Sequence, residues 1–346
     1  MNKTVLLASA ALAISTLSQA AVARDHIEIV GSSTVYPFAT VVAEKFGKAT
    51  KFKTPKIEST GSGGGMKLFC KGLGEGTPDV TNASRRIKMK EFKKCHANGV
   101  NDITEVLIGY DGIALANSKK AQQFELSLRD IYLALAEHVP AKDGSEKLVP
   151  NFYKTWDQVN SKLPSTKIEV LGPPPTSGTR DAFNELAIEG GCKTFPWLKA
   201  VKKQDKKLYK KQCRTIREDG AYIEAGENDN LIVQKLEANP NALGVFGFSF
   251  LDQNADKVQG SKVNGNAPTF DSIAEGDYKI SRPLYFYVKN AHVGKIPGIA
   301  EFVKAFVSKK ASGAEGYLTD KGLIPLDKAA HKKMAKAAKS MKNLAL

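Results

Sequence analysis

Apolar and polar positions along residues 26–99 repeat one order three times: a strand pattern, a short loop and a helical pattern. The strand patterns are rich in β-branched residues, and the helical runs have apolar residues three and four positions apart. The strands are expected at residues 26–30, 55–60 and 79–84, and the helices at 36–48, 66–73 and 88–99. Three such units in succession predict a parallel sheet with crossover helices, in which ligands bind beyond the carboxyl ends of the strands.

Two longer apolar stretches indicate how the chain is divided. "ITEVLIGYDGIALANS" (103–118) is too long for an ordinary strand and lacks helix caps, and "KISRPLYFYVKN" (279–290) has the same character. Helical and strand patterns alternate between them. We therefore expect an α/β fold of two lobes joined by two crossover strands, with a ligand cleft between the lobes. Lobe I would comprise residues 24–110 and 286–346, and lobe II residues 111–285.

The amino-terminal segment has the features of a secretory signal. Lys3 precedes an apolar run of about a dozen residues, and the tripeptide at 21–23 is a cleavage site of the small-x-small type. We expect a signal peptide at residues 1–23 that is cleaved after Ala23, with Ala20 as the second choice. The mature chain would then begin outside the cytoplasm.

Four cysteines, Cys70, Cys95, Cys192 and Cys213, would in that case lie in an oxidising compartment. An even number suggests disulfides, for which three connectivities are possible. Proximity in the sequence favours Cys70–Cys95 and Cys192–Cys213. The cysteines and histidines lack the spacing of a zinc site, so we expect neither a metal nor a cofactor.

The net charge of +15 favours anionic partners. Much of this charge is local, because lysine pairs recur at 202/203, 206/207 and 210/211, and six lysines lie within residues 327–346. The simplest interpretation of both segments is the solvated face of a helix. Nucleic acid is not an expected partner, since the chain is secreted and its lysine runs lack interleaved aromatic residues. An alternative is an interaction protein whose basic surface holds acidic partners or anionic lipid.

Four loops share one chemistry, because each follows an expected strand, contains Ser, Thr or Gly, and opens a helix or turn. They are "GSSTVYP" (31–37), "TGSGGG" (60–65), "NASRR" (82–86) and "TSGTR" (176–180). Glycine lets the backbone approach a ligand closely, hydroxyls donate to oxyanion oxygens, and helix N-termini favour a compact anion. Arg85, Arg86 and Arg180 could add a bidentate guanidinium. The predicted site suits a tetrahedral oxyanion.

The same serines could instead be nucleophiles of a hydrolase. Neither Ser62 nor Ser177 lies in a G-x-S-x-G nucleophile elbow, and the five histidines form no recognisable catalytic motif. The glycine loop at 60–65 matches neither a P-loop nor a dinucleotide-binding fingerprint. We therefore expect a binding protein, not an enzyme.

Eight motifs occur in the order found in one family: "VGSSTVYPF", "ESTGSGGGMK", "DVTNASRRI", "LSLRDIY", "TWDQVNSKLP", "TSGTRDAF", "GVFGFSF" and "GYLTDKGLIPL". In this combination the chain resembles the PstS-type phosphate-binding proteins of ABC transporters over nearly its whole mature length. The resemblance implies the type II periplasmic binding protein fold, whose two lobes close on phosphate and deliver it to a membrane permease. We accordingly expect a periplasmic monomer.

The resemblance also implies a set of phosphate ligands on the four loops. Carried over position by position, they are Ser33, Thr34, Ser62, Ser84, Ser177, Gly178 and Thr179. These groups would surround a dehydrated phosphate with direct hydrogen bonds. Well-known relatives have an arginine where this chain has Pro173, so Arg85 and Arg180 are the expected replacement cations.

A second departure concerns selectivity. Some relatives have an aspartate where this chain has Ser84, and that carboxylate accepts the proton of monohydrogen phosphate, which sulfate lacks. Asp111 and Asp181 are candidate substitute acceptors, although a structural carboxylate is the simpler interpretation of each. The segment 225–230 could likewise reach the cleft through Asn228 or Asp229, although a helix start is its simpler interpretation. The nearest alternative function is therefore a receptor for another oxyanion, namely sulfate, molybdate, phosphonate or phosphite.

Overall fold

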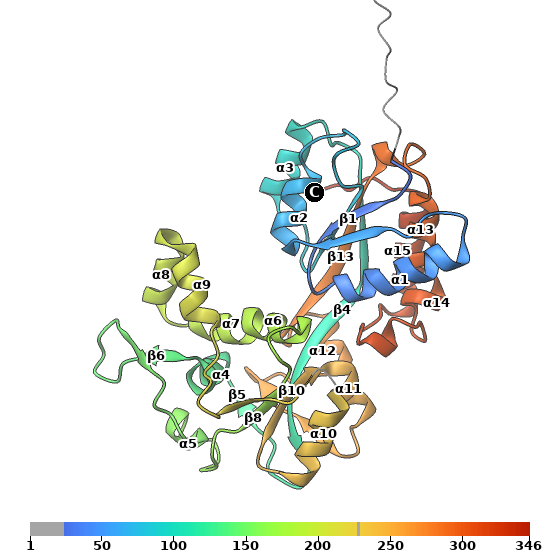
Figure 1. Ribbon diagram of the computed structural model, residues 1–346. Helices are drawn as coiled ribbons and strands as arrows, with labels where there is room; N and C mark the ends of the chain where they lie inside the picture. The colour runs from blue at the N-terminus through green and yellow to red at the C-terminus, as the bar shows by residue number, and fades with distance from the viewer. Residues whose placement is uncertain (1–23, 227–228) are drawn as a thin grey trace, which may run out of the picture.

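The computed structural model describes residues 24–226 and 229–346, so the expected signal segment and Asn228 lie outside the described part of the chain. Two lobes are visible, joined by two long strands (Figure 1). Within the described residues, a nine-stranded sheet passes through both lobes in the order β2-β1-β3-β13-β4-β10-β8-β9, with β11 paired to β4. The strands are β1 (Glu28–Gly31), β2 (Lys56–Ser59), β3 (Val80–Ala83), β4 (Ile103–Ser118), β8 (Val170–Gly172), β9 (Tyr222–Glu224), β10 (Leu243–Gly247), β11 (Val258–Gly260) and β13 (Ser281–Lys289).

Short pairs of strands lie outside this sheet in lobe II. They are β5 (Glu125–Leu126) with β12 (Lys262–Val263), and β6 (His138–Pro140) with β7 (Leu148–Pro150). The helices of lobe I are α1 (Tyr36–Ala49), α2 (Gly61–Phe69), α3 (Met89–Ala97), α13 (Ile299–Phe306), α14 (Lys309–Ser312) and α15 (Lys328–Lys339). Those of lobe II are α4 (Leu128–Leu135), α5 (Trp156–Val159), α6 (Gly178–Phe183), α7 (Glu189–Cys192), α8 (Pro196–Gln204), α9 (Lys206–Arg214), α10 (Asp229–Ala238), α11 (Phe248–Gln253) and α12 (Phe270–Ala274).

The expected parallel sheet is confirmed for the first three strand-loop-helix units, since β1 pairs in parallel with both β2 and β3. Lobe II has a second parallel group, in which β8 pairs with β9 and β10. The carboxyl ends of these strands lead into the polar loops. The connecting strands β4 and β13 run antiparallel to each other.

The sixteen-residue stretch 103–118 forms one continuous strand, β4. Its first part pairs with β13, up to Gly112 opposite Ser281, and its second part pairs with β10 and β11. Both connecting strands therefore belong to the hydrogen-bonded framework of the molecule. The expected lobe boundaries at 110/111 and 285/286 fall within these two strands and stay a prediction.

Separate hydrophobic cores support the two lobes. In lobe I, α1 packs on α13, and the rings of Phe46 and Phe302 meet edge to face with centroids 5.6 Å apart. In lobe II, Trp156 and Tyr132 are fully buried in a large cluster that also includes both cysteines of one disulfide. Each lobe therefore has the apolar core that an independently packed unit needs.

The glycine segment at 60–65 differs from the expected loop. Helix α2 begins at Gly61, so these glycines form its first turns and not a loop before it. A Cβ atom at Gly65 would lie 2.5 Å from the Gly31 Cα atom and 2.5 Å from the Thr81 hydroxyl. Close packing of the helix on β1 and β3 therefore requires glycine here, which overrides the low helix propensity of this residue.

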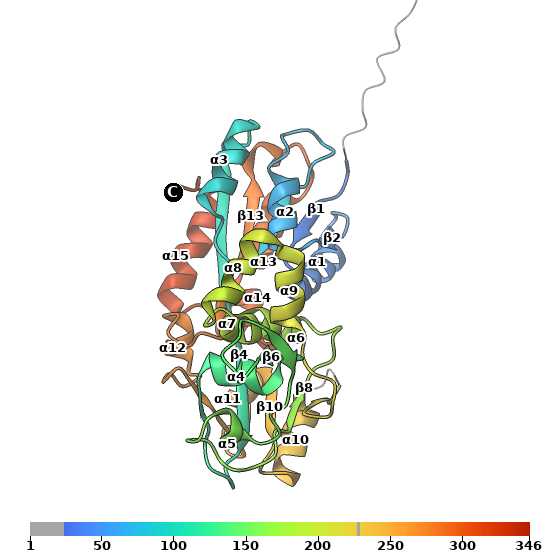
Figure 2. The same ribbon diagram turned by 90° about the vertical axis from the view of Figure 1, so that its left-hand side faces the viewer.

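Two disulfides fasten helices that lie near each other in sequence. Cys70 is joined to Cys95 and Cys192 to Cys213, which is the pairing expected from sequence proximity. The second bridge fixes the hairpin of α8 and α9 to α7. This hairpin projects from lobe II on the side where α2 and α3 lie on lobe I (Figures 1 and 2).

Among the described residues, every helix is too short or too polar to cross a lipid bilayer.

Candidate functional site

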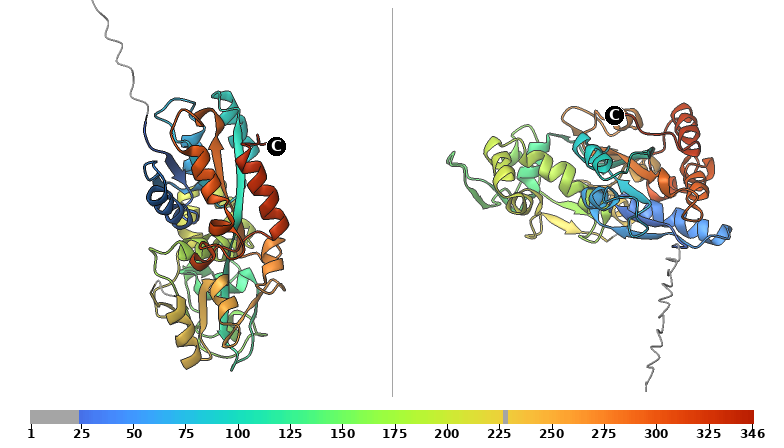
Figure 3. Two further views of the ribbon diagram at one scale, coloured as in Figure 1. Left: turned by 90° about the vertical axis from the view of Figure 1, so that its right-hand side faces the viewer. Right: turned by 90° about the horizontal axis from the view of Figure 1, so that it is seen from above.

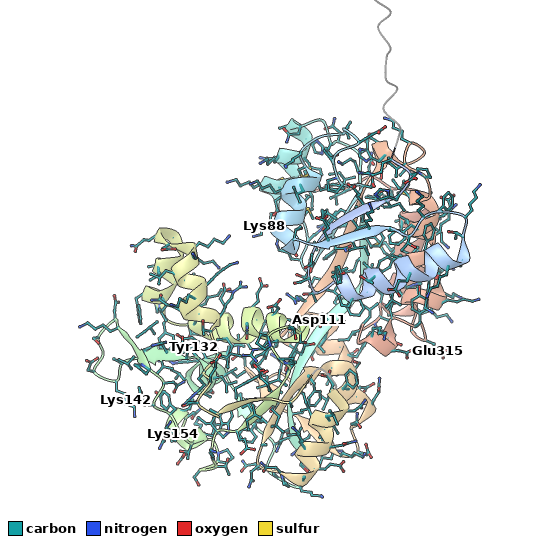
Figure 4. The ribbon with its side chains drawn as sticks, viewed as in Figure 1. Lys88, Asp111, Tyr132, Lys142, Lys154 and Glu315 are labelled. Atoms are coloured by element: carbon teal, nitrogen blue, oxygen red, sulfur yellow. A yellow bond between two sulfur atoms is a disulfide. The ribbon has the colours of Figure 1, made fainter. Side chains whose placement is uncertain are left out.

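Arg282 on β13 is the centre of a polar cluster where the two lobes meet. Its residue is 7% exposed, and its partner in the strand register is Asp111 on β4. The guanidinium Nε donates to Asp111 Oδ2 at 3.3 Å, Nη1 donates to Ser84 Oγ at 3.4 Å, and Nη2 donates to the Thr34 hydroxyl. Figure 4 shows Asp111 at the junction of the lobes. One guanidinium therefore links three segments that are far apart in the sequence.

The second and third loops are joined directly to this cluster. Ser62 lies in the first turn of α2, and its hydroxyl is 3.2 Å from the Ser84 hydroxyl. The backbone N–H of Ser84 also donates to Ser62 Oγ at 3.0 Å. The Ser84 hydroxyl thus links Arg282 to the Ser62 hydroxyl. Each hydroxyl can donate or accept a hydrogen bond, so both can also bond to a ligand.

The fourth loop, from lobe II, reaches the first loop. A Cβ atom at Gly178 would lie 3.9 Å from the Ser33 carbonyl oxygen. Ser177 is the N-cap of α6, and its hydroxyl accepts from the Thr179 N–H at 3.2 Å. The helix continues through a π-helical turn (Asn184–Ile188) into α7. The positive end of this helical run therefore faces the loop that contains Thr34.

Glu185, in that π-helical turn, also faces the cluster. Its carboxylate is 3.6 Å from Nη1 of Arg282 and 3.5 Å from the guanidinium of Arg214. The Glu185 side chain is 49% exposed, so it is accessible to solvent and to a ligand. It brings a carboxylate of lobe II to the guanidinium on the connecting strand.

The arginines expected to bind an anion have other partners. Arg85 forms a bidentate pair with Glu91 at 2.6 and 2.8 Å, and this hydrogen bonding raises the pKa of Arg85. Arg86 donates to both carboxylate oxygens of Glu105 at 3.0 Å. Each of these two guanidinium groups is therefore already paired with a carboxylate. The role of Arg85 and Arg86 as anion ligands stays a prediction.

Arg180 is buried within lobe II. Its Nη1 donates to the Pro173 carbonyl oxygen at 3.1 Å, and its guanidinium carbon lies 4.1 Å from the centroid of the Tyr222 ring. The Tyr222 hydroxyl donates to the same Pro173 oxygen at 2.9 Å. These contacts hold the proline loop in place before α6. Asp181, the next residue, is exposed in the first turn of that helix.

Asp229 lies at the start of α10, where its Oδ2 accepts from the Gly247 N–H at 3.3 Å at the end of β10. Burial raises the pKa of Asp229 from 3.8 to about 6, against the smaller opposing effect of that hydrogen bond. The expected helix start is confirmed at this position. The carboxyl group is thus a structural partner of the strand end.

Arg282, the residue that organises the cluster, was not among the residues expected from the sequence. It lies in the second crossing segment, which was interpreted only as a connection. One signal was present: a charged residue inside an otherwise apolar strand is costly to bury unless it is paired or binds a ligand. Its position opposite Asp111 depends on the register of two strands that are more than 160 residues apart.

The residues in the two described ranges contain no group of three or more His, Cys, Asp or Glu side chains arranged to hold a metal ion. The arrangement at Arg282 instead offers hydroxyl donors, helix N-termini and one guanidinium. Such a set has the donors that suit a compact oxyanion.

Comparisons with known proteins agree with this chemistry. A family model described as a PBP superfamily domain matches residues 17–310. A relative from Staphylococcus saprophyticus named phosphate-binding protein PstS is 31% identical over 307 residues, which cover 86% of this chain and 79% of that protein. The chain belongs to the PstS-type members of the PBP superfamily. Protein SphX of Synechococcus elongatus, a further relative of this PstS-type chain, is 29% identical and covers 93% of it and 84% of SphX.

A solved structure supports the same assignment of fold. The crystal structure of a possible phosphate binding protein from Planctomyces limnophilus is 26% identical to this PstS-type chain, with a TM-score of 0.71. The similarity covers 92% of this chain and 99% of that one. The expected two-lobed periplasmic binding protein fold is therefore confirmed.

Proposed function

We propose that this protein captures inorganic phosphate where its two lobes meet, and delivers it to the membrane permease of an ABC transporter. The family membership and the names of its relatives support this function. The observation that carries it is the position of Arg282, whose guanidinium gathers loops from lobe I beside a helix N-terminus from lobe II.

Phosphate would be bound by hydroxyls and backbone N–H groups from both lobes. Thr34, Ser62 and Ser84 supply hydroxyls from lobe I, and the segment 177–179 supplies the capped N-terminus of α6 from lobe II. Arg282 supplies the charge. Neutral donors and one guanidinium can replace the hydration shell of an oxyanion, because charge-assisted hydrogen bonds are stronger than neutral ones.

Asp111 would act as a positioning residue for Arg282. Its carboxylate fixes Nε and leaves Nη1 and Nη2 directed at the loops. Because the Asp111 side chain is only 17% exposed, it is a weaker candidate for the proton acceptor than the sequence suggested. Glu185 is the better candidate, since it lies beside Nη1 and stays accessible. Glu185 would accept the proton of monohydrogen phosphate and repel sulfate, which has none to donate.

Binding would close the lobes by a hinge at β4 and β13, the two strands that join them. The protein performs no covalent chemistry, acts as a monomer and has no nucleic-acid partner. After removal of the signal peptide near Ala23 it would work in the periplasm. A receptor for another tetrahedral oxyanion is the alternative, because Ser84 stands where some relatives have an aspartate.

Calorimetric titration of the mature chain tests the function. Residues 24–346, freed of carried-over ligand, are titrated with phosphate alone and then with phosphate in excess sulfate. Tight one-to-one binding that sulfate does not weaken is the expected result. Heat with sulfate and none with phosphate would assign a different oxyanion, and no heat with either anion would refute the proposal.

A pair of matched variants locates the site. Ser177→Ala with Thr179→Ala should abolish tight binding, because it removes the cap of α6 and one hydroxyl. Lys206→Gln with Lys210→Gln removes two exposed charges of the α9 hairpin and should leave the affinity nearly unchanged. Equal losses in both variants would contradict binding at the fourth loop.

A further inference from the structure

A groove lined by lysines lies on lobe I, between α14 and α15. Figure 1 shows these two helices on the side of the lobe away from α2 and α3. The volume of the groove is about 1200 Å³. Helix α15, the red helix near the carboxyl terminus in Figure 3, lies on the outside of the lobe. The lysines of this groove are Lys309, Lys310, Lys328, Lys332, Lys336 and Lys339. We call this feature the lysine groove.

The charges of the lysine groove have no counter-ions within residues 24–226 and 229–346. None of its six lysines takes part in an ion pair there, and all six are exposed. By contrast, Lys202 and Lys193 on lobe II both pair with the buried Glu189. The one acidic residue of the lining is Glu315, which is exposed at the edge of lobe I (Figure 4). The groove is therefore a concentrated positive surface that the fold itself does not neutralise.

Four of the lysines form a row along α15. Lys328, Lys332 and Lys336 are four residues apart, and Lys339 follows three residues later, so all four lie on one face of the helix. At about 1.5 Å per residue the row is roughly 16 Å long, with about 6 Å between neighbours. Carboxylates on a helix at every fourth position, or on every second residue of a strand, repeat at about the same distance.

The floor of the lysine groove is apolar. Val307, Leu326 and Ala335 line it and are 4%, 3% and 8% exposed, and Ala314 lies exposed beside them. A concave apolar floor between charged rims fits an occupant that carries apolar groups between its charges. This combination favours a polypeptide over a polyphosphate chain, which has no apolar part, and over a flat membrane surface.

His331 lines the groove, and its pKa is affected by the lysines around it. His331 is 9% exposed, and its Nε2 lies 3.2 Å from Ser312 Oγ. Burial, followed by the charges of Lys309 and Lys339, lowers the pKa of His331. Lysines from both rims thus produce a positive electrostatic potential inside the groove. An incoming carboxylate would be attracted by the same potential.

We propose that the lysine groove binds an acidic polypeptide segment of a partner protein, whose carboxylates contact the α14 and α15 rims while its apolar residues cover the floor. This surface is separate from the phosphate site, so the proposal does not depend on the identity of the captured anion. On this proposal the lysines of the carboxyl-terminal region bind a partner, and are not only the solvated face of a helix.

The probe for this test is a fluorescent synthetic helical peptide with glutamates at every fourth position and leucines beside them. Its matched control replaces each glutamate with glutamine. Fluorescence anisotropy with the full mature chain should show salt-sensitive binding of the glutamate peptide and at least tenfold weaker binding of the glutamine peptide. Equal binding of both peptides would overturn the proposal.

Charge-reversal variants locate the contact. Lys332→Glu with Lys336→Glu should weaken peptide binding by about tenfold, because two attractive contacts become repulsive. Lys206→Glu with Lys210→Glu on α9 has the same spacing and the same change in net charge, and should change the affinity less than about twofold. Equal losses in the two variants would show a general field and refute a local site.

Two further measurements complete the test. Ala314→Trp fills the exposed part of the floor without changing the charge, and should also weaken binding of the peptide. Calorimetric phosphate binding and the melting curve check that each variant is folded and functional. Binding of phosphatidylglycerol vesicles or inorganic polyphosphate in preference to the peptide would assign the groove to a different class of partner and overturn the proposal.

Discussion

Replacing Arg282 with glutamine tests the proposed phosphate site most directly. Two of its guanidinium nitrogens, Nη1 and Nη2, face Ser84 and Thr34, where the anion would bind. Each hydrogen bond to a charged partner contributes about 1.5 to 3 kcal/mol, so losing both should cost about 3 to 6 kcal/mol. The dissociation constant for phosphate should therefore rise by roughly two to four orders of magnitude.

The assay is calorimetric titration of wild type, Arg282→Gln and Arg282→Lys at fixed ionic strength. Lysine keeps the charge but not the planar fork, so Arg282→Lys should fall between the other two. Arg85→Gln is the matched control, because that guanidinium is engaged by Glu91 and should contribute little to binding.

Arg282→Gln also leaves the carboxylate of Asp111 without its cation, and this residue is partly buried. A second variant, Arg282→Gln with Asp111→Asn, removes both charges and separates loss of binding from loss of stability. Phosphate affinity within about threefold of wild type in either variant, with a normal melting curve, would refute the reasoning, because about threefold corresponds to less than a single hydrogen bond to a charged group.

Three other substitutions test separate features. Asp229→Asn should stabilise the protein by up to about 3 kcal/mol at pH 8, and not at pH 4, in urea titrations. The raised pKa of about 6 means that the folded wild type holds the proton more tightly than the unfolded chain does, so the wild type loses stability as the pH rises from about 4 to 6. Glu185→Gln should reduce the preference for phosphate over sulfate, measured as the ratio of the two dissociation constants. Replacing Cys192 and Cys213 with alanine should lower the free energy of unfolding by about 3 kcal/mol, since the bridge closes a loop of 21 residues.

Each of these expectations has a contradicting result. An Asp229→Asn effect on the free energy of unfolding that is the same at pH 4 and pH 8 would mean that the pKa of this carboxyl group is the same in the folded and unfolded states. Tighter binding of both anions to Glu185→Gln, with an unchanged ratio, would make Glu185 a repulsive charge and not a proton acceptor. Unchanged urea midpoints without the Cys192–Cys213 bridge would show that packing alone holds α7 to α9.

Local patterns in the sequence predicted most elements of the fold, because hydrophobic periodicity and turn residues act over a few positions. Helix α1 was expected at 36–48 and is found at 36–49, and the segment 103–118 is one strand as expected. Three of the four polar loops were located for the same reason. The start of α2 was not, since the low helix propensity of glycine favours a loop here and the close packing of Gly65 on β1 and β3 is a tertiary contact.

The partners of Arg85, Arg180 and Arg282 could not all be predicted from local patterns. Arg180 contacts the Pro173 carbonyl and the Tyr222 ring within lobe II, and Tyr222 comes from a strand more than 40 residues away. Arg85 is captured by Glu91 from the next helix. Arg282 meets Asp111 through strand register, which a single sequence without contact information does not contain.

The location of Arg282 on a connecting strand has a mechanical consequence. If the lobes rotate about β4 and β13, the guanidinium lies close to the fulcrum and moves little, while the tips of α8 and α9 lie at the end of a long lever arm. A small rearrangement around a bound anion would thus be amplified into a large displacement of the outer surface. A pair of fluorophores on α3 and α9 would register closure with far more sensitivity than a probe placed beside the anion.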